Sequence, residues 1–208
     1  MVRSGALVLG VLLVACTEGG LQPRSDDHEA GGGKPPPPQG AVAFRVGVPP
    51  GRICSHTNAT MSMPPNVAGV LEALTCDLTK GCKPDEFVVV DRDRGATVAC
   101  SVAPSGSNFT VSAMLRVDGS STGSESVSFG LSGVISRTGG MATINEQNSV
   151  AGGGGVDPAC TVSIVSPMGA IKPGGIWGSF ECQNFRNNAD ISETGCLLSG
   201  QFLFENCN

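Results

Sequence analysis

The sequence predicts an all-β fold: an antiparallel β-sandwich or jelly-roll-like domain with one short helix, stapled by disulfides. Three observations lead to this prediction. Several segments alternate apolar and polar residues, as strands with one buried face do. Charged residues make up only 15% of the chain, which favours a neutral, hydroxyl-rich β surface over exposed helices. Nine cysteines are present, and eight of them lie beyond residue 50, an even number that can pair completely.

The predicted elements begin at residue 41. Residues 41–48 place an apolar side chain at every second position, which predicts a strand. Residues 66–76 place apolar side chains at helical spacing, which predicts the one helix, with Asn66 as its N-cap. Residues 86–102 are expected to form two strands around a turn near 91–95.

The strongest alternation follows in residues 108–119 and 125–136, which predict a hairpin with one solvated face. Residues 141–147 predict another strand, and the glycine-rich residues 150–158 predict a long loop. Residues 160–207 predict three more strands. About nine short strands at such spacing are typical of a β-sandwich.

Residues 1–15 have the pattern of a secretory signal peptide. Arg3 provides a positive start, and an apolar run of 11 residues extends from 5 to 15. As a helix this run would span roughly 16 Å, whereas a bilayer core needs about 20 apolar residues. A short apolar region after a charged start, ending in small residues, therefore predicts export rather than a transmembrane helix.

The leader ends in Leu13-Val14-Ala15-Cys16, which resembles the lipobox of bacterial lipoproteins. The resemblance implies that the Cys16 thiol receives a diacylglycerol and that cleavage makes Cys16 the first mature residue. Two or more acyl chains would hold the protein stably at a membrane. Thr17 stands where an Asp would favour retention at the inner membrane, so the resemblance implies the outer membrane, with the domain periplasmic or surface-exposed. The alternative is a secreted protein cleaved nearby.

The mature chain divides into a lipidated tether, residues 16–40, and a β-sandwich domain, residues 41–208. Residues 17–40 contain much glycine, proline and charge and almost no apolar side chains, which predicts a disordered segment. Fully extended, it would reach roughly 80 Å. We expect it to hold the domain away from the membrane.

The remaining cysteines are expected to form four disulfides, because an exported chain folds in an oxidising compartment. They are Cys54, Cys76, Cys82, Cys100, Cys160, Cys182, Cys196 and Cys207. Cys182 ends one predicted strand and Cys196 begins the next, so this pair is expected first. Cys160 is a rival partner for Cys182, because the two would lie opposite each other in a symmetric hairpin.

The other pairings rest on chain length and elimination. Cys196 and Cys207 bound one predicted strand, which would separate them by roughly 36 Å, so their pairing is excluded unless the strand is broken. Cys76 with Cys82 would close a short loop after the helix. Cys54 with Cys100 follows by elimination.

The composition excludes several chemistries. The net charge is −5 without clustered basic residues, so nucleic acid is excluded as a partner. No CxxC pair is present and histidine is scarce, so we predict no metal and no cofactor. His56 is the one histidine in the predicted domain, and its neighbour Ser55 would point away from it on an extended chain, so a nucleophilic serine is not expected.

Two acidic features remain open. Glu125, Glu146, Glu181 and Glu205 could include a carboxylate pair for glycoside hydrolysis, although solvated strand carboxylates are the default interpretation. Residues 91–95 and 190–193 loosely resemble calcium loops, but 91–95 lacks a third ligand and the distal Glu, which favours a β-turn.

Trp177, the only tryptophan, has the opposite strand parity to Ile176 and Phe180. It is either a binding contact on a solvated face or part of a doubly buried strand. The sequence as a whole predicts a membrane-anchored lipoprotein of the cell envelope with a non-catalytic binding or structural module. An envelope protein or a glycan is the expected partner, and a carbohydrate-active or other hydrolytic domain using acidic residues is the alternative.

Overall fold

The computed structural model describes residues 34–54, 60–63, 88–93, 95–118, 126–148, 153–164, 169–187 and 195–208. The chain divides into two compact units, Met1–Lys34 and Pro35–Asn208, and the fold below belongs to the second. The predicted signal peptide, Cys16 and the predicted helix over 66–76 lie outside the described residues.

The described residues of the second unit form one antiparallel sheet of eleven strands. The strands are β1 (Gln39–Gly47), β2 (Thr60–Met63), β3 (Val89–Val90), β4 (Ala96–Ser105), β5 (Asn108–Asp118), β6 (Ser126–Ile135), β7 (Gly139–Asn148), β8 (Gly153–Ser163), β9 (Ala170–Lys172), β10 (Gly175–Asn187) and β11 (Cys196–Glu205). Their main order is β2-β1-β11-β10-β8-β7-β6-β5-β4, with β3 beside β1 and β9 beside β10.

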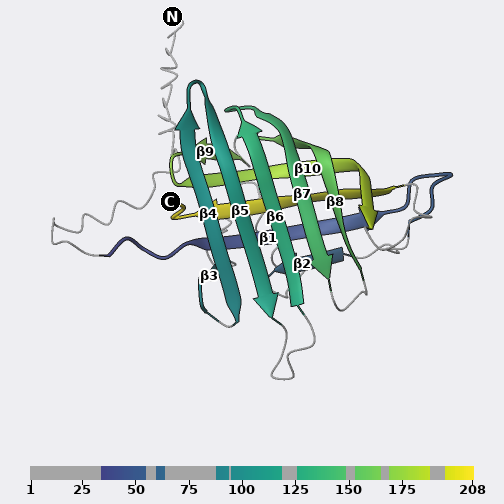
Figure 1. Cartoon of the computed structure of the whole chain (residues 1–208), viewed down its shortest axis with the longest axis horizontal. Coiled ribbons are helices and arrows are strands. Elements are labelled where there is room, and N and C mark those ends of the chain that lie inside the picture. Colours follow the sequence, from purple (N-terminus) through teal and green to yellow (C-terminus); the bar gives the residue numbers. More distant parts are fainter. Residues whose placement is uncertain are drawn as a thin grey trace, which may run out of the picture. The chain divides into compact units, whose positions relative to one another are not determined.

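The sheet folds over itself into two layers (Figure 1). Strands β4 to β8 are successive neighbours and form one layer, and β10, β11 and β1 cross behind it at a steep angle. Because β8 pairs with both β7 and β10, the two layers are continuous. The prediction of an all-β antiparallel sandwich is confirmed, and a single sheet supplies both layers.

The core lies between the layers and takes one side of each strand. Buried and exposed residues alternate along β5, and β5 pairs with β6 throughout, as the predicted hairpin requires. Aromatic rings join the layers: the ring centroid of Phe129 lies 5.2 Å from that of Phe180, which lies 6.2 Å from that of Phe202. Phe129 belongs to β6, whereas Phe180 and Phe202 belong to the other layer.

The second layer also carries an apolar cluster on its outer side. Ala41, Ala43, Trp177 and Leu203 form this outer cluster, and Trp177 is only 5% exposed. The run of buried residues at the start of β1 follows from this double burial. Trp177 therefore corresponds to the doubly buried interpretation, and the exposed contact considered from the sequence is not present.

Part of the glycine-rich segment predicted as a loop is a strand. β8 begins at Gly153, inside residues 150–158. A Cβ on Gly155 would lie 2.7 Å from the Phe185 ring, so the missing side chain lets β8 approach β10 closely. The turn predicted near 91–95 is present between β3 and β4, with Arg92 in the left-handed region at a φ of 68°.

The residues after β11 cover the edge of β4, the last strand in the sheet order. The Val102 amide donates to the Asn208 carbonyl at 3.2 Å, and the Asn208 amide donates to the Cys100 carbonyl at 3.0 Å. Gly174 connects β4 to the C-terminal residues. Its amide donates a hydrogen bond to the Val102 carbonyl, and its carbonyl accepts one from the Cys207 amide. The layers are thereby joined at this edge as well as through β8.

Among the described residues, three disulfides hold this arrangement: Cys54–Cys196, Cys100–Cys207 and Cys160–Cys182. Their Cα atoms lie 5.2, 4.8 and 4.2 Å apart. Such bonds indicate an oxidising, extracytoplasmic environment. Cys76 and Cys82 lie outside the described residues, so their pairing stays a prediction.

Two predicted pairings are wrong. Cys182 does not end its strand, because β10 continues to Asn187, and Cys182 lies opposite Leu198 rather than Cys196. Its bond to Cys160 confirms the rival pairing. The pairing of Cys54 with Cys100 is also wrong, because Cys54 bonds Cys196 while Cys100 lies on β4 beside the C-terminal residues.

The exclusion of a bond between Cys196 and Cys207 is confirmed. Cys196 begins β11, and Cys207 lies beyond its last residue, Glu205. Each cysteine bonds a different part of the chain, Cys54 and Cys100 respectively. The two bonds therefore anchor opposite ends of β11.

Candidate functional site

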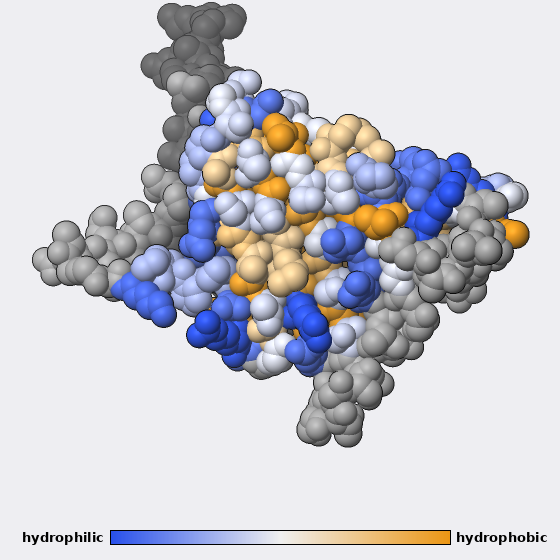
Figure 2. Space-filling view, viewed as in Figure 1, coloured by the Kyte–Doolittle hydropathy of each residue, from blue (hydrophilic) through white to orange (hydrophobic). Residues whose placement is uncertain are grey.

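The two layers present different outer faces. Figure 2 shows a mixture of polar and apolar side chains over the layer of β4 to β8, where Met114, Val134 and Met141 are 41%, 56% and 55% exposed. The outer side of β1, β11, β10 and β8 instead contains an open depression of about 500 Å³. Its polar lining residues are Arg45, Thr161, Ser163, Ser179, Glu181, Ser199 and Gln201. We call this feature the outer depression.

Strand register brings these residues together from distant parts of the sequence. In one row, Arg45 lies opposite Ser199, Ser199 opposite Glu181, and Glu181 opposite Thr161. In the next row, Gln201 lies opposite Ser179, which lies opposite Ser163. Neighbouring residues of opposite parity, such as Phe44, Leu198 and Phe180, point into the core. The outer depression is therefore the polar half of the same alternation that builds the core.

The lining combines one cation with many hydrogen-bonding groups. Arg45 is exposed and has no ion pair or hydrogen bond in the described part of the protein. Glu181 is exposed too, and its carboxylate accepts a hydrogen bond from the Gln183 amide. The Oε1 atom of Gln201 is buried without a hydrogen-bond partner. Such a surface can bind a polar ligand by hydrogen bonds and by one charged contact.

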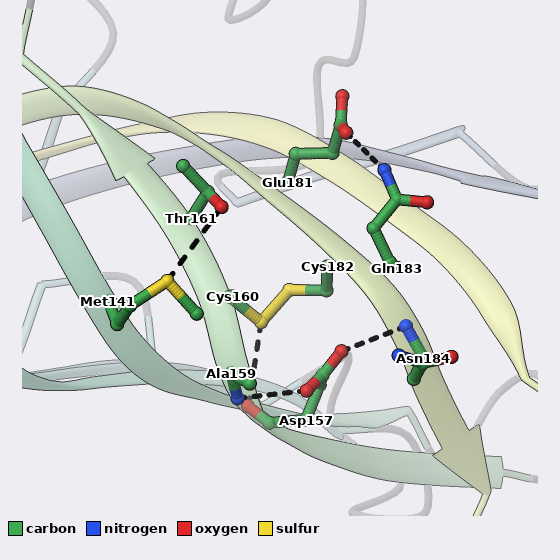
Figure 3. Close-up of a disulfide and its surroundings, with 9 residues drawn as sticks. All are labelled: Met141, Asp157, Ala159, Cys160, Thr161, Glu181, Cys182, Gln183 and Asn184. Atoms are coloured by element: carbon green, nitrogen blue, oxygen red, sulfur yellow. Dashed lines mark hydrogen bonds between the residues drawn. A yellow bond between two sulfur atoms is a disulfide. The ribbon is translucent and has the colours of Figure 1, made fainter.

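Behind the outer depression, one buried carboxylate supports two irregular strands (Figure 3). The register of β8 against β7 shifts between Ala142 and Ile144, and that of β10 against β11 shifts between Cys182 and Phe185. Asp157, 2% exposed, accepts hydrogen bonds from the Ala159 amide and the Asn184 amide, each at 2.9 Å. It thus satisfies backbone donors at both shifts.

Asp157 also lies beside the disulfide between Cys160 and Cys182. The three ligand atoms lie within 4.8 Å of one another, a spacing that could hold a metal. However, the two sulfurs are bonded to each other. Zinc binds cysteine as a free thiolate, so the oxidised protein uses this cluster for structure.

Glu146 is the second buried acid. It lies on β7, opposite Phe129 on one side and Gly155 on the other, and is 2% exposed. Its Oε1 atom has no hydrogen-bond partner. Burial raises the pKa of Glu146 from 4.5 to about 7, because the charged form loses its hydration.

The three candidate acids that the structure describes do not form a pair facing one site. Glu146 points into the protein, whereas Glu181 belongs to the outer depression. Glu205 accepts a hydrogen bond from the Gln39 amide at 2.8 Å. Glu205 lies opposite Gly175, six residues along β10 from Glu181, which corresponds to about 20 Å. Glu125 lies outside the described residues.

The remaining candidates have structural roles or cannot be placed. Asp91 accepts a hydrogen bond from the Val98 amide at 2.9 Å, and its carboxylate lies 3.5 Å from Arg92, as the β-turn interpretation of 91–95 expects. Ser55, His56 and residues 190–193 lie outside the described part of the chain.

Sequence reasoning missed the outer depression and Asp157. The signal for the depression was present as polar residues at alternate positions of three strands, but only the strand order shows that they meet. Asp157 follows a run of glycines in the segment predicted as a loop.

Comparison with known proteins gives no relative: no protein-family model, no curated protein and no solved structure matches the chain. Within the described ranges, no helix is both long and apolar enough to cross a membrane.

We predict that Asp157→Asn lowers the free energy of unfolding by roughly 1–3 kcal/mol, because an amide has one acceptor oxygen for the two backbone donors that Asp157 satisfies. Urea denaturation measures this change. Asp118→Asn is the control, because Asp118 forms an exposed pair with Arg116, and we expect a loss below about 1 kcal/mol. Equal losses would refute the role given to Asp157.

The raised pKa of Glu146 predicts that stability depends on pH. The folded protein holds the Glu146 proton more tightly than the unfolded chain does. The contribution of this proton to the free energy of unfolding is therefore complete below pH 4.5, and it is lost as pH rises through about 7. The loss is on the order of 3 kcal/mol. We expect Glu146→Gln to remove this pH dependence of stability, which urea denaturation at several pH values measures. The exposed Glu181→Gln should keep the wild-type pH profile, and an unchanged profile in Glu146→Gln would contradict the assignment.

Proposed function

We propose that this protein is a lipoprotein of the bacterial cell envelope, anchored through Cys16, whose β-domain is a non-catalytic binding module. The observation that carries the proposal is the lipobox-like Leu13-Val14-Ala15-Cys16 at the end of an apolar run of 11 residues. Lipid on Cys16 would supply two or more acyl chains, and that number anchors a protein stably. The membrane is then one partner, and an envelope protein or a glycan is the other.

The cysteines support this proposal. Six of them form disulfides in the described part of the domain, as suits an exported protein. Cys16 stands apart from them in a segment with few apolar residues after it. A tether between Cys16 and β1, which begins at Gln39, would separate the anchor from the domain and leave the outer depression accessible. Thr17 favours the outer membrane through the same resemblance.

The acids favour binding over hydrolysis. Glycoside hydrolysis uses two carboxyl groups about 5–10 Å apart that face one substrate. In the described part of the chain, Glu181 is the acid that lines the outer depression, and Glu146 lies on the other side of the sheet. A surface with hydroxyl, amide and guanidinium groups and one carboxylate is suited to holding a ligand.

We predict that Cys16→Ser abolishes anchoring, because serine lacks the thiol that receives the lipid. In cells that process lipoproteins, the variant should remain an uncut precursor and should incorporate no labelled fatty acid. Thr17→Ala is the matched control, and it should be lipidated and cut like the wild type. Incorporation of labelled fatty acid into Cys16→Ser at the wild-type level would rule out the anchor.

A further inference from the structure

The outer depression has the chemistry of a site for a polyhydroxylated ligand. Ser199 and Thr161 alternate with Arg45 and Glu181 across four strands, and Ser179 and Ser163 lie in the next row. Neighbouring strands lie about 4.8 Å apart, so polar groups repeat at short intervals across the depression. Hydroxyl side chains both donate and accept hydrogen bonds, as do the hydroxyls of a sugar.

Arg45 favours a ligand that carries a negative charge. Its guanidinium is exposed and, in the described part of the chain, has neither an ion pair nor a hydrogen bond. A guanidinium presents two parallel donors that match the two oxygens of a carboxylate. A ligand with a carboxylate would therefore gain its strongest contact at this end of the outer depression.

Glu181 sets the orientation of such a ligand. It lies two strands from Arg45, with Ser199 between them, so the two backbones are about 10 Å apart. A carboxylate repels a second negative charge, but it accepts hydrogen bonds from neutral hydroxyls. The acidic group of the ligand would then lie at Arg45, and its hydroxyls would lie toward Glu181 and Thr161.

Gln201 supplies an acceptor that lacks a donor. Its Oε1 atom is buried without a hydrogen-bond partner, and an unpaired buried polar atom is unfavourable. Because this oxygen has almost no accessible surface, the Gln201 side chain would have to turn toward the outer depression, where a ligand hydroxyl can then donate to it. The need for a donor again favours a hydroxylated ligand over a purely anionic one.

From these groups we propose that the outer depression binds a saccharide chain carrying a carboxylate, such as one containing uronic acid residues. The volume of about 500 Å³ lies within the range of small-ligand sites. An extended peptide would pair with a strand edge rather than lie on a face. The inference rests on the proposed binding function and specifies its ligand class.

The experiment is calorimetric titration of the mature protein in detergent with hexagalacturonate and with its methyl ester, which keeps the hydroxyls and removes the charge. We expect the acid to bind at least about tenfold more tightly than the ester, because one charge-assisted contact is lost. Arg45→Gln should bind both the acid and the ester with the affinity that the wild-type protein has for the ester. Arg116→Gln, an exposed charge change on β5, is the matched control and should behave like the wild type.

The proposal is overturned if the acid and the ester bind equally, if neither binds at millimolar concentration, or if Arg116→Gln loses as much affinity as Arg45→Gln. These results would leave the anchor intact, because lipidation is measured separately with Cys16→Ser. Conversely, loss of the anchor would not affect titration of the domain. The anchor and the ligand class can therefore fail independently of each other.

Discussion

The contact between the C-terminal residues and β4 determines how the sheet is organised. Without it, one long antiparallel sheet would end in an exposed edge strand, which favours association with other chains. The hydrogen bonds between Asn208 and β4, together with the Cys100–Cys207 disulfide, cover that edge. The two layers are then fixed against each other, and the phenylalanine rings between them form a common core.

The second constraint lies where β8 leaves one layer and pairs with the other. The Cys160–Cys182 bond joins β8 to β10, and Asp157 satisfies the amides freed by the register shifts in both strands. The same two strands carry Thr161 and Glu181 on their outer side (Figure 3). The buried structural cluster therefore positions part of the outer depression, and a binding surface on these strands gains rigidity from it.

The sequence predicts local structure well and long-range pairing poorly. Alternation identified β5 and β6 because each strand has one buried and one solvated side. Alternation could not reveal that β1 lies beside β11, which brings Arg45 next to Ser199 across more than 150 residues of chain. The predicted pairings of Cys54 and Cys196 failed for the same reason: the partner of Cys196 depends on where the chain after β1 leads. Trp177 could not be assigned because the start of its strand is buried on both sides.

The disulfide-linked sheet is the basis of these conclusions, since its bonds indicate an oxidising environment and its strand register forms the outer depression. Peptide mapping of the unreduced protein by mass spectrometry tests it most directly. The structure predicts peptides that link Cys54 to Cys196, Cys100 to Cys207 and Cys160 to Cys182. Peptides that link Cys182 to Cys196 or Cys54 to Cys100, or free thiols at these six positions, would contradict it.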